Sequence, residues 1–260
     1  MSPVDALAIE TDGLTKRYGE TTAVSDLTMD VERGTVYGFL GPNGAGKTTT
    51  MRMLTTLTKP TAGTARVAGH SIQDRESVTP HIGYLPEEPP VYDELTGREQ
   101  LEYAAGLRDM PEEAASERIE SLLERFDLLE DANKRIEDYS KGMRQKVGVI
   151  QAVLHEPAVA FLDEPTSGLD PRAARTMRDT IAELADREMT IFLSTHILPV
   201  VDELADEIGV LHDGELVAEG DPETLKSRAE TGDARSLEDA FLEITREPGE
   251  EGLAAGRAAE

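Results

Sequence analysis

The sequence predicts an α/β fold in which a mainly parallel sheet carries an antiparallel β region and a helical insertion. Three observations lead to this prediction. Short runs such as 158–162, which is continuously apolar, and 190–194, which is mostly apolar, are typical of parallel strands buried on both faces. Longer segments that alternate apolar and polar residues precede them, as in half-buried antiparallel strands. Between Pro86 and about Pro157 the pattern changes to helical periodicity.

The first third of the chain reads mostly as strands. Segments 7–18 and 24–31 alternate apolar and polar residues, and the turn Gly19-Glu20 separates them, which predicts an antiparallel pair. A loop at 58–63 contains a proline and a glycine. The remaining elements expected here are a buried strand at 35–40, a helix at 47–56 and short strands at 64–68 and 81–85.

The rest of the chain is predicted to be helical first and then α/β. Insertion helices are expected at 98–107, 112–126 and 142–155, followed by a helix at 171–186 that Pro171 opens. The Asp-Gly turn at Asp213-Gly214 predicts a hairpin between 208–211 and 215–218, and closing helices are expected at 221–228 and 236–245. We therefore expect one domain over 1–246, with a core at 1–85 and 158–228, an insertion at 86–157, a C-terminal helix at 236–246 and a mobile tail at 247–260.

Composition limits the classes of function. The chain has 260 residues and no cysteine, which excludes disulfides, thiol catalysis and thiolate metal sites. No stretch approaches the ~18–20 apolar residues of a membrane span, and the first residues lack the features of a signal peptide. We expect a soluble, cytoplasmic protein.

The charge balance is strongly acidic. Asp and Glu number 52 against 26 Lys and Arg, so the formal net charge is −26. Free nucleic acid is therefore an unfavourable partner, because affinity for phosphate backbones requires clustered positive charge. One interpretation is an acidic protein from an ordinary cell. The acidity is spread over the whole chain instead of forming a tail, however, which favours adaptation to a salt-rich, halophilic cytoplasm.

A glycine-rich segment, Gly41–Thr49 (GPNGAGKTT), follows directly after an apolar run and precedes a predicted helix. It fits the pattern G-x-x-x-x-G-K-[ST]. Glycines let the backbone curl so that several N–H groups point at one phosphate, and the helix N-terminus adds positive potential. Lys47 would supply a charge to the outer phosphates and Thr48 a magnesium ligand. The segment predicts that the protein binds a nucleoside triphosphate.

Two adjacent carboxylates, Asp163 and Glu164, follow the buried strand 158–162. Alone, the pair could be a solvated strand end or a helix cap. Triphosphate hydrolysis, however, requires a carboxylate to hold hydrated Mg²⁺ and a group to orient or deprotonate the attacking water. Together with the glycine-rich loop, the pair predicts Asp163 as the magnesium-side carboxylate and Glu164 as the catalytic base.

The segment YSKGMRQ begins the last insertion helix. Ser140 is a good helix cap, so a purely structural role is one interpretation. The other is a second anion site formed by the Ser140 hydroxyl, the Gly142 backbone and the helix N-terminus. The two interpretations remain open on these residues alone.

The order GPNGAGKTT, YSKGMRQK, VAFLDE, SGLD and STH resembles the ATP-binding cassette (ABC) ATPases, the nucleotide-binding subunits of ABC transporters, over nearly the whole chain. The resemblance implies a P-loop NTPase (RecA-like) core, ATP and Mg²⁺ as cofactors, and ATP hydrolysis. The residues that match the family's nucleotide-contacting positions are Tyr18, Gly41, Asn43, Gly44, Gly46, Lys47, Thr48, Thr49, Ser140, Gly142, Asp170 and His196.

The resemblance also implies roles for single residues. Tyr18 would stack on adenine, although an ordinary strand-end tyrosine is the alternative. Ser140 and Gly142 would contact the γ-phosphate bound by an opposite subunit. Asp170 would couple the two sites of a dimer, and His196 would lie near the γ-phosphate.

Three features depart from the common family pattern or refine it. The signature reads Tyr-Ser-Lys-Gly-Met, not Leu-Ser-Gly-Gly-Gln, but it keeps Ser140 and the second glycine. Glu87 stands where the family usually has glutamine; it could ligate magnesium or orient water, but a carboxylate only accepts hydrogen bonds and adds negative charge. The segment Ser236–Thr245 resembles the C-terminal helix of cassettes that serve exporters of drugs or polysaccharides.

The implied mechanism is a head-to-tail dimer, homomeric or heteromeric, with two ATP molecules at the interface. It would drive a separate transmembrane permease at the inner face of the membrane, with motion passing through the Glu87 region and 88–100. The alternative is a soluble ABC-type ATPase acting on ribosomes or DNA, although the single cassette and the missing basic patch favour the transporter. A different P-loop enzyme, such as a kinase or GTPase, would leave the later motifs unexplained.

Overall fold

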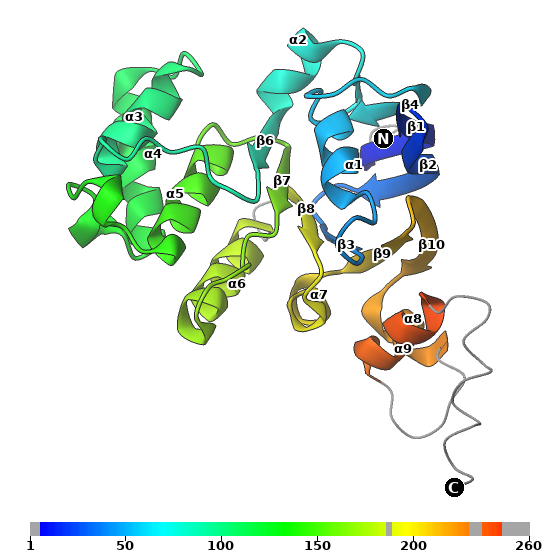
Figure 1. The fold of residues 1–260 in the computed structure, drawn as a ribbon. Helices are drawn as coiled ribbons and strands as arrows, with labels where there is room; N and C mark the ends of the chain where they lie inside the picture. The colour runs from blue at the N-terminus through cyan, green and yellow to red at the C-terminus, as the bar shows by residue number, and fades with distance from the viewer. Residues whose placement is uncertain (1–5, 186–188, 229–235, 246–260) are drawn as a thin grey trace, which may run out of the picture.

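The computed structural model describes residues 6–185, 189–228 and 236–245. Two sheets organise this part of the chain (Figure 1). The larger sheet has six strands in the order β10-β9-β3-β8-β7-β6. Its strands are β3 (Val36–Leu40), β6 (Ile82–Leu85), β7 (Val159–Asp163), β8 (Thr190–Thr195), β9 (Glu207–His212) and β10 (Glu215–Gly220).

The larger sheet is parallel except at one edge. Strands β6, β7, β8, β3 and β9 run parallel to their neighbours, and β10 pairs antiparallel with β9 through the predicted hairpin. All residues of β3, β7 and β8 are buried, which explains their continuous apolar sequences. Asp213 and Gly214 both have positive φ at the hairpin turn, as a two-residue turn of this kind requires.

The smaller sheet is antiparallel, with strand order β2-β1-β4-β5. It contains β1 (Leu7–Tyr18), β2 (Thr21–Glu32), β4 (Ala62–Val67) and β5 (His70–Ser71). The predicted pairing of the first two strands is confirmed. Strand β4 begins inside the segment expected to be a loop, because it pairs with β1 from Ala62 onward, and β5 is too short to show a periodic pattern.

One apolar core lies between the two sheets and includes helix α1 (Lys47–Leu54) (Figure 1). Phe192 on β8 is at its centre and contacts the rings of Tyr37 and Phe39 on β3 and of Phe161 on β7. Leu14 from β1 belongs to the same cluster. This packing fixes α1, and with it the glycine-rich loop, against the end of β3.

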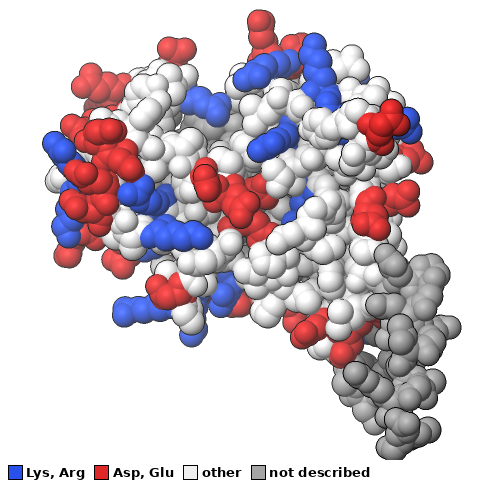
Figure 2. Space-filling model, in the orientation of Figure 1, with Lys and Arg blue, Asp and Glu red and all other residues white. Residues whose placement is uncertain are grey.

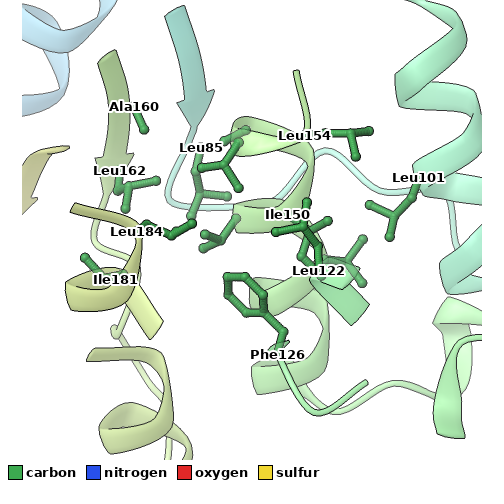
Figure 3. Close-up of a cluster of buried hydrophobic side chains, with 14 of the residues drawn as sticks. Leu85, Leu101, Leu122, Phe126, Ile150, Leu154, Ala160, Leu162, Ile181 and Leu184 are labelled. Atoms are coloured by element: carbon green, nitrogen blue, oxygen red, sulfur yellow. The ribbon is translucent and has the colours of Figure 1, made fainter. Parts of the chain in front are cut away.

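A second core joins the other face of the parallel sheet to the helices (Figures 1 and 3). Leu162 of the sheet, Ile150 and Ile181 of the covering helices and Phe126 of the segment between β6 and β7 belong to it. The predicted helices are α3 (Gly97–Gly106), α4 (Glu112–Arg125), α5 (Lys141–Val153), α6 (Pro171–Ala185), α8 (Pro222–Arg228) and α9 (Leu237–Ile244). They agree with expectation to within a few residues.

Several short elements were not predicted. They are α2 (Arg75–Val78), α7 (Leu198–Leu204) and the 3-10 turns Thr79–His81, Leu129–Asp131 and Ile136–Asp138. Each is too short for helical periodicity to be recognised. Within the described ranges, no helix has the length and apolar character needed to cross a membrane. The expected tail at 247–260 and the last residue of the predicted helix 171–186 lie outside the described residues.

Candidate functional site

The glycine-rich loop joins the carboxyl end of β3 to the N-terminus of α1. Gly44 and Gly46 have φ of 87° and 109°, in the left-handed region that favours glycine. A Cβ on Gly41 would collide with the carbonyl of Leu211, and one on Gly46 with the carbonyl of Ala23. The loop therefore packs tightly against Ala23 and Leu211. The first backbone N–H groups of α1 are available to bind an anion there.

Lys47 is the first residue of α1, and its side chain turns back over the loop. Its Nζ donates to the carbonyls of Gly41 at 2.7 Å and Pro42 at 3.2 Å, and it lies 3.8 Å from Oε1 of Glu164. Burial lowers the pKa of Lys47, and the carboxylates of Glu164 and Asp163 oppose that shift. The result is a positive charge held by acceptors at the floor of the loop.

Asp163, at the end of β7, receives two hydroxyl hydrogen bonds. Ser194 on β8 donates to Oδ1 at 2.9 Å, and Thr48 on α1 donates to Oδ2 at 2.9 Å. Burial raises the pKa of Asp163, while the two hydroxyl donors lower it. The hydroxyl and carboxylate oxygens of Thr48 and Asp163 form the kind of donor set that Mg²⁺ takes together with substrate phosphates.

Glu164 is held by the end of the neighbouring strand. Thr195 Oγ1 donates to its Oε2 at 3.0 Å, and His196 Nδ1 lies 2.8 Å from its Oε1. Its backbone has φ of 50°, and its N–H donates to the carbonyl of Ser194 at 2.9 Å. Non-glycine residues in the left-handed region cluster at functional sites, where surrounding contacts compensate the strain. The side chain is 8% exposed, whereas that of His196 is 45% exposed.

These residues face one cavity of about 440 Å³. The residues that line it are Ala23, Asn43, Gly44, Gly46, Lys47, Thr48, Thr49, Glu87, Asp163, Glu164, Ser167 and His196. The structure thus brings together residues from five separate parts of the chain. The paired carboxylates and His196 lie at the carboxyl edge of the parallel sheet, as expected. Gly41 is not among these lining residues, but its carbonyl accepts a hydrogen bond from Lys47.

Besides Gly41, four predicted residues do not line this cavity. Tyr18 ends β1 and is 49% exposed, with the Lys16 ammonium 4.9 Å from its ring centre. Ser140 caps α5 by accepting from the N–H of Met143 at 3.2 Å. The other two, Gly142 and Asp170, lie near this helix end.

The starts of α5 and α6 lie side by side. A Cβ on Gly142 would be 3.4 Å from Cβ of Ala173, which leaves an ordinary contact. Asp170 Oδ1 accepts from the backbone N–H groups of Arg172 and Ala173 at 3.0 Å each, so Asp170 caps α6. Both helix starts therefore have a local structural cap, and within the described chain neither belongs to the phosphate-loop cavity.

Sequence reasoning assigned no role to four residues that the structure places in the site. Ser194 and Thr195 orient the two carboxylates, and Ala23 and Ser167 complete the cavity wall. The signal for the first two was present, because hydroxyl residues at the end of a strand beside the Asp-Glu strand could have been expected to reach those carboxylates. Ala23 and Ser167 carry no such signal.

Comparison with known proteins agrees with this geometry. Residues 24–167 match the ABC transporter family. Daunorubicin resistance ATP-binding protein DrrA3 of Streptomyces coeruleorubidus is 42% identical over 248 residues, which cover 95% of this chain and 76% of that protein. Bacitracin transport ATP-binding protein BcrA of Enterococcus faecalis is 40% identical over 222 residues, 85% of this chain and 71% of that protein.

A solved structure described as an ATP-binding subunit of an ABC transporter has a TM-score of 0.83 and 32% identity, and covers 92% of this chain and 100% of its own. In our protein, the phosphate loop, the paired carboxylates and the strand-end histidine line one cavity. The solved ATP-binding subunit has the same fold. The chain belongs to the ABC transporter ATP-binding family, whose members bind and hydrolyse ATP.

Proposed function

We propose that this chain is the ATP-hydrolysing subunit of an exporter-type ABC transporter whose permease is a separate polypeptide. The observation that carries the proposal is that one cavity is lined by the phosphate-loop residues, the paired carboxylates and the strand-end histidine. These residues are Lys47, Thr48, Asp163, Glu164 and His196. Relatives named for daunorubicin resistance and for bacitracin transport support the exporter role. Such names also favour a transporter over a soluble ATPase that acts on ribosomes or DNA.

In the proposed reaction, Glu164 accepts the proton of the water that attacks the γ-phosphate. Thr195 donates a hydrogen bond to one oxygen of the Glu164 carboxylate, and Nδ1 of His196 lies within hydrogen-bond distance of the other. The base is therefore oriented before the water arrives. Lys47 supplies positive charge to the outer phosphates, where charge grows during transfer. A positioned general base of this kind contributes about 10²–10⁴-fold to a rate.

The oxygen donors of Thr48 and Asp163 fit Mg²⁺. Their 2.9 Å hydrogen bond places a hydroxyl and a carboxylate oxygen side by side at the cavity, and Glu87 lines the same space. Bound there, the ion would neutralise phosphate charge during transfer. Thr48 and Asp163 would hold the ion, and the hydrogen bond from Ser194 would keep the Asp163 carboxylate in place.

Tyr18, Ser140, Gly142 and Asp170 are proposed to act in a dimer that encloses ATP. Ser140 and Gly142 lie at a helix N-terminus that suits an anion but is outside the chain's own cavity. A partner cassette, identical or different, would therefore bring its nucleotide to this helix end. Tyr18 would stack on adenine beside the chain's own loop, and Asp170 would join the two sites.

The proposed partner places the protein at the inner face of the membrane. Residues 88–100, which follow Glu87, are proposed to pass the motion of the dimer to the permease.

Figure 2 shows acidic side chains gathered over the helical segment on the viewed face, with basic ones interspersed. We also propose that the net charge of −26 reflects adaptation to a salt-rich cytoplasm.

The test is affinity capture of Glu164→Gln with ATP and Mg²⁺ from native membranes at high salt, followed by mass spectrometry. The variant removes the base and keeps the shape of the side chain, so a closed, ATP-bound complex should accumulate. A co-purifying polytopic membrane protein is the expected result. Ribosomal or DNA-repair proteins without a membrane partner would favour the soluble alternative, and brisk ATP hydrolysis by the variant would remove Glu164 as the base.

A further inference from the structure

The loop that carries Glu87 is tied to the helix that Ser140 caps. After β6, the chain crosses an irregular segment before α3 begins at Gly97, and Glu87 in this segment lines the nucleotide cavity. Asp93 lies further along the same segment. Its Oδ1 accepts a hydrogen bond from Nη1 of Arg144, which stands near the start of α5. An ion pair therefore connects the cavity loop to the start of α5.

The same guanidinium holds the residues that lead into Ser140. Its Nη2 donates to the carbonyl of Glu137 at 3.4 Å and its Nε to that of Tyr139 at 3.5 Å. The N–H of Glu137 also donates to the carbonyl of Asp93 at 3.0 Å. Arg144 thus contacts both Asp93 in the Glu87 loop and the residues that precede Ser140. Its planar guanidinium fixes the orientation of these two segments relative to each other.

Further along α5, packing joins the same two parts. A Cβ on Gly148 would lie 2.9 Å from Cβ of Pro89, so the loop is in close contact with the middle of the helix. Gln100 is almost fully buried; its Oε1 accepts from the N–H of Tyr92 at 2.9 Å, and its Nε2 donates to Gln151 on α5 at 2.6 Å. The loop and the helix consequently form one packed unit, and the ion pair lies at the end nearest Ser140.

The ion pair itself is partly solvated. The side chains of Arg144 and Asp93 are 30% and 57% exposed. A pair so exposed contributes little to the free energy of folding. Its removal should therefore leave the protein folded, and any functional effect would come from orientation of the Ser140 end of α5.

We propose that Asp93 and Arg144 are positioning residues that transmit ATP binding in the chain's own cavity to the contact that Ser140 makes with the partner's nucleotide. The inference rests on the ATP-enclosing dimer proposed above. Glu87 faces the bound triphosphate, Asp93 lies in the same loop, and Arg144 carries a change in that loop to the start of α5. Neither residue lines the nucleotide cavity, so each acts on dimer closure and not on ATP binding by the single chain.

The experiment uses the full chain with Glu164→Gln as the parent, so that ATP is kept. Asp93→Asn, Arg144→Gln and the double variant are added to it. Calorimetry on dilute, monomeric protein measures the affinity for ATP with Mg²⁺, and sedimentation velocity measures ATP-driven dimerisation. We expect ATP affinity to change less than about twofold, while each single variant weakens dimerisation about three- to thirtyfold, which lies within the range for residues that interact directly. The double variant should lose no more than the worse single one.

Arg178→Gln is the matched control. Arg178 on α6 forms a similarly exposed ion pair with Glu203 on α7, and contacts neither the Glu87 loop nor α5 in that pair. It should dimerise like the parent, and all variants should keep the parent's melting temperature. Unchanged dimerisation of the Asp93 and Arg144 variants, fully additive losses, or an equal loss in the control would overturn the inference. A parent that does not dimerise with ATP would overturn the dimer itself, and the inference with it.

Discussion

His155 should make the stability of this protein depend on pH. It follows the end of α5, and its Nε2 donates to the carbonyl of Ile82 at 2.9 Å, which assigns the proton to Nε2. Its Nδ1 is buried and has no hydrogen-bond partner among the described residues. Burial lowers the pKa of His155 from 6.5 to about 4, and the nearby charge of Arg108 adds to the effect. We therefore predict that His155→Gln reduces the pH dependence of stability.

The sign and magnitude follow from proton binding. The folded protein holds His155 neutral where the unfolded chain would protonate it, so the contribution is complete above pH 6.5 and is lost as the pH falls through about 4. At pH 5 the difference amounts to about 2 kcal/mol relative to pH 8. Because the ring is only partly shielded from solvent, we expect about 1–2 kcal/mol. That corresponds to roughly 2–8 °C in melting temperature for a chain of this size.

The assay is urea unfolding of both proteins at pH 8, 6 and 5. The other four histidines are shared, so the difference between the proteins isolates His155. Glutamine keeps a donor for Ile82, so the variant should lose little at pH 8. We expect the unfolding free energy of the original protein to fall more steeply toward pH 5 than that of the variant. Parallel pH curves would refute the reasoning and show that His155 is protonated in the folded state.

Three further predictions concern the site and the charge balance. Glu87→Gln removes a negative charge from the cavity and should lower the KM for ATP by about two- to tenfold at low salt; an unchanged KM would show that Glu87 does not face the triphosphate. Asp163→Asn should reduce the ATPase rate on the order of 100-fold, whereas Asp179→Asn on the exposed face of α6 should not, and steady-state hydrolysis distinguishes the two. Thermal melting in 0.1–2 M KCl should show increasing stability, because salt screens a net charge of −26; greatest stability in dilute buffer would contradict salt adaptation.

The principal strands and helices could be predicted because each has a local cause. Apolar runs mark the buried strands β3, β7 and β8, and helical periodicity marks α4 and α5. Elements such as β5 and α7 were missed, since pairing and packing with distant residues determine them. Their own sequences are too short to carry a period.

The candidate site shows the same division. The chemistry of the loop Gly41–Thr49 and of the Asp163-Glu164 pair could be predicted from the sequence, because glycine conformation and adjacent carboxylates are local properties. The contacts of Ser194 and Thr195 with those carboxylates depend on β8 lying beside β7. No local pattern specifies that neighbour.

By itself, the sequence predicted that this protein binds and hydrolyses a nucleoside triphosphate, because the phosphate loop and the carboxylate pair are short continuous motifs. The resemblance to the ABC ATPases identified that nucleotide as ATP. Only the tertiary structure decided which residues act together. Strand order brings His196 to Glu164 and Thr48 to Asp163, and it leaves Ser140 outside the cavity. It also joins Asp93 to Arg144. Such contacts depend on how distant segments pack, since a residue's partners across a sheet edge or a helix interface are set by the fold and not by its neighbours in the chain.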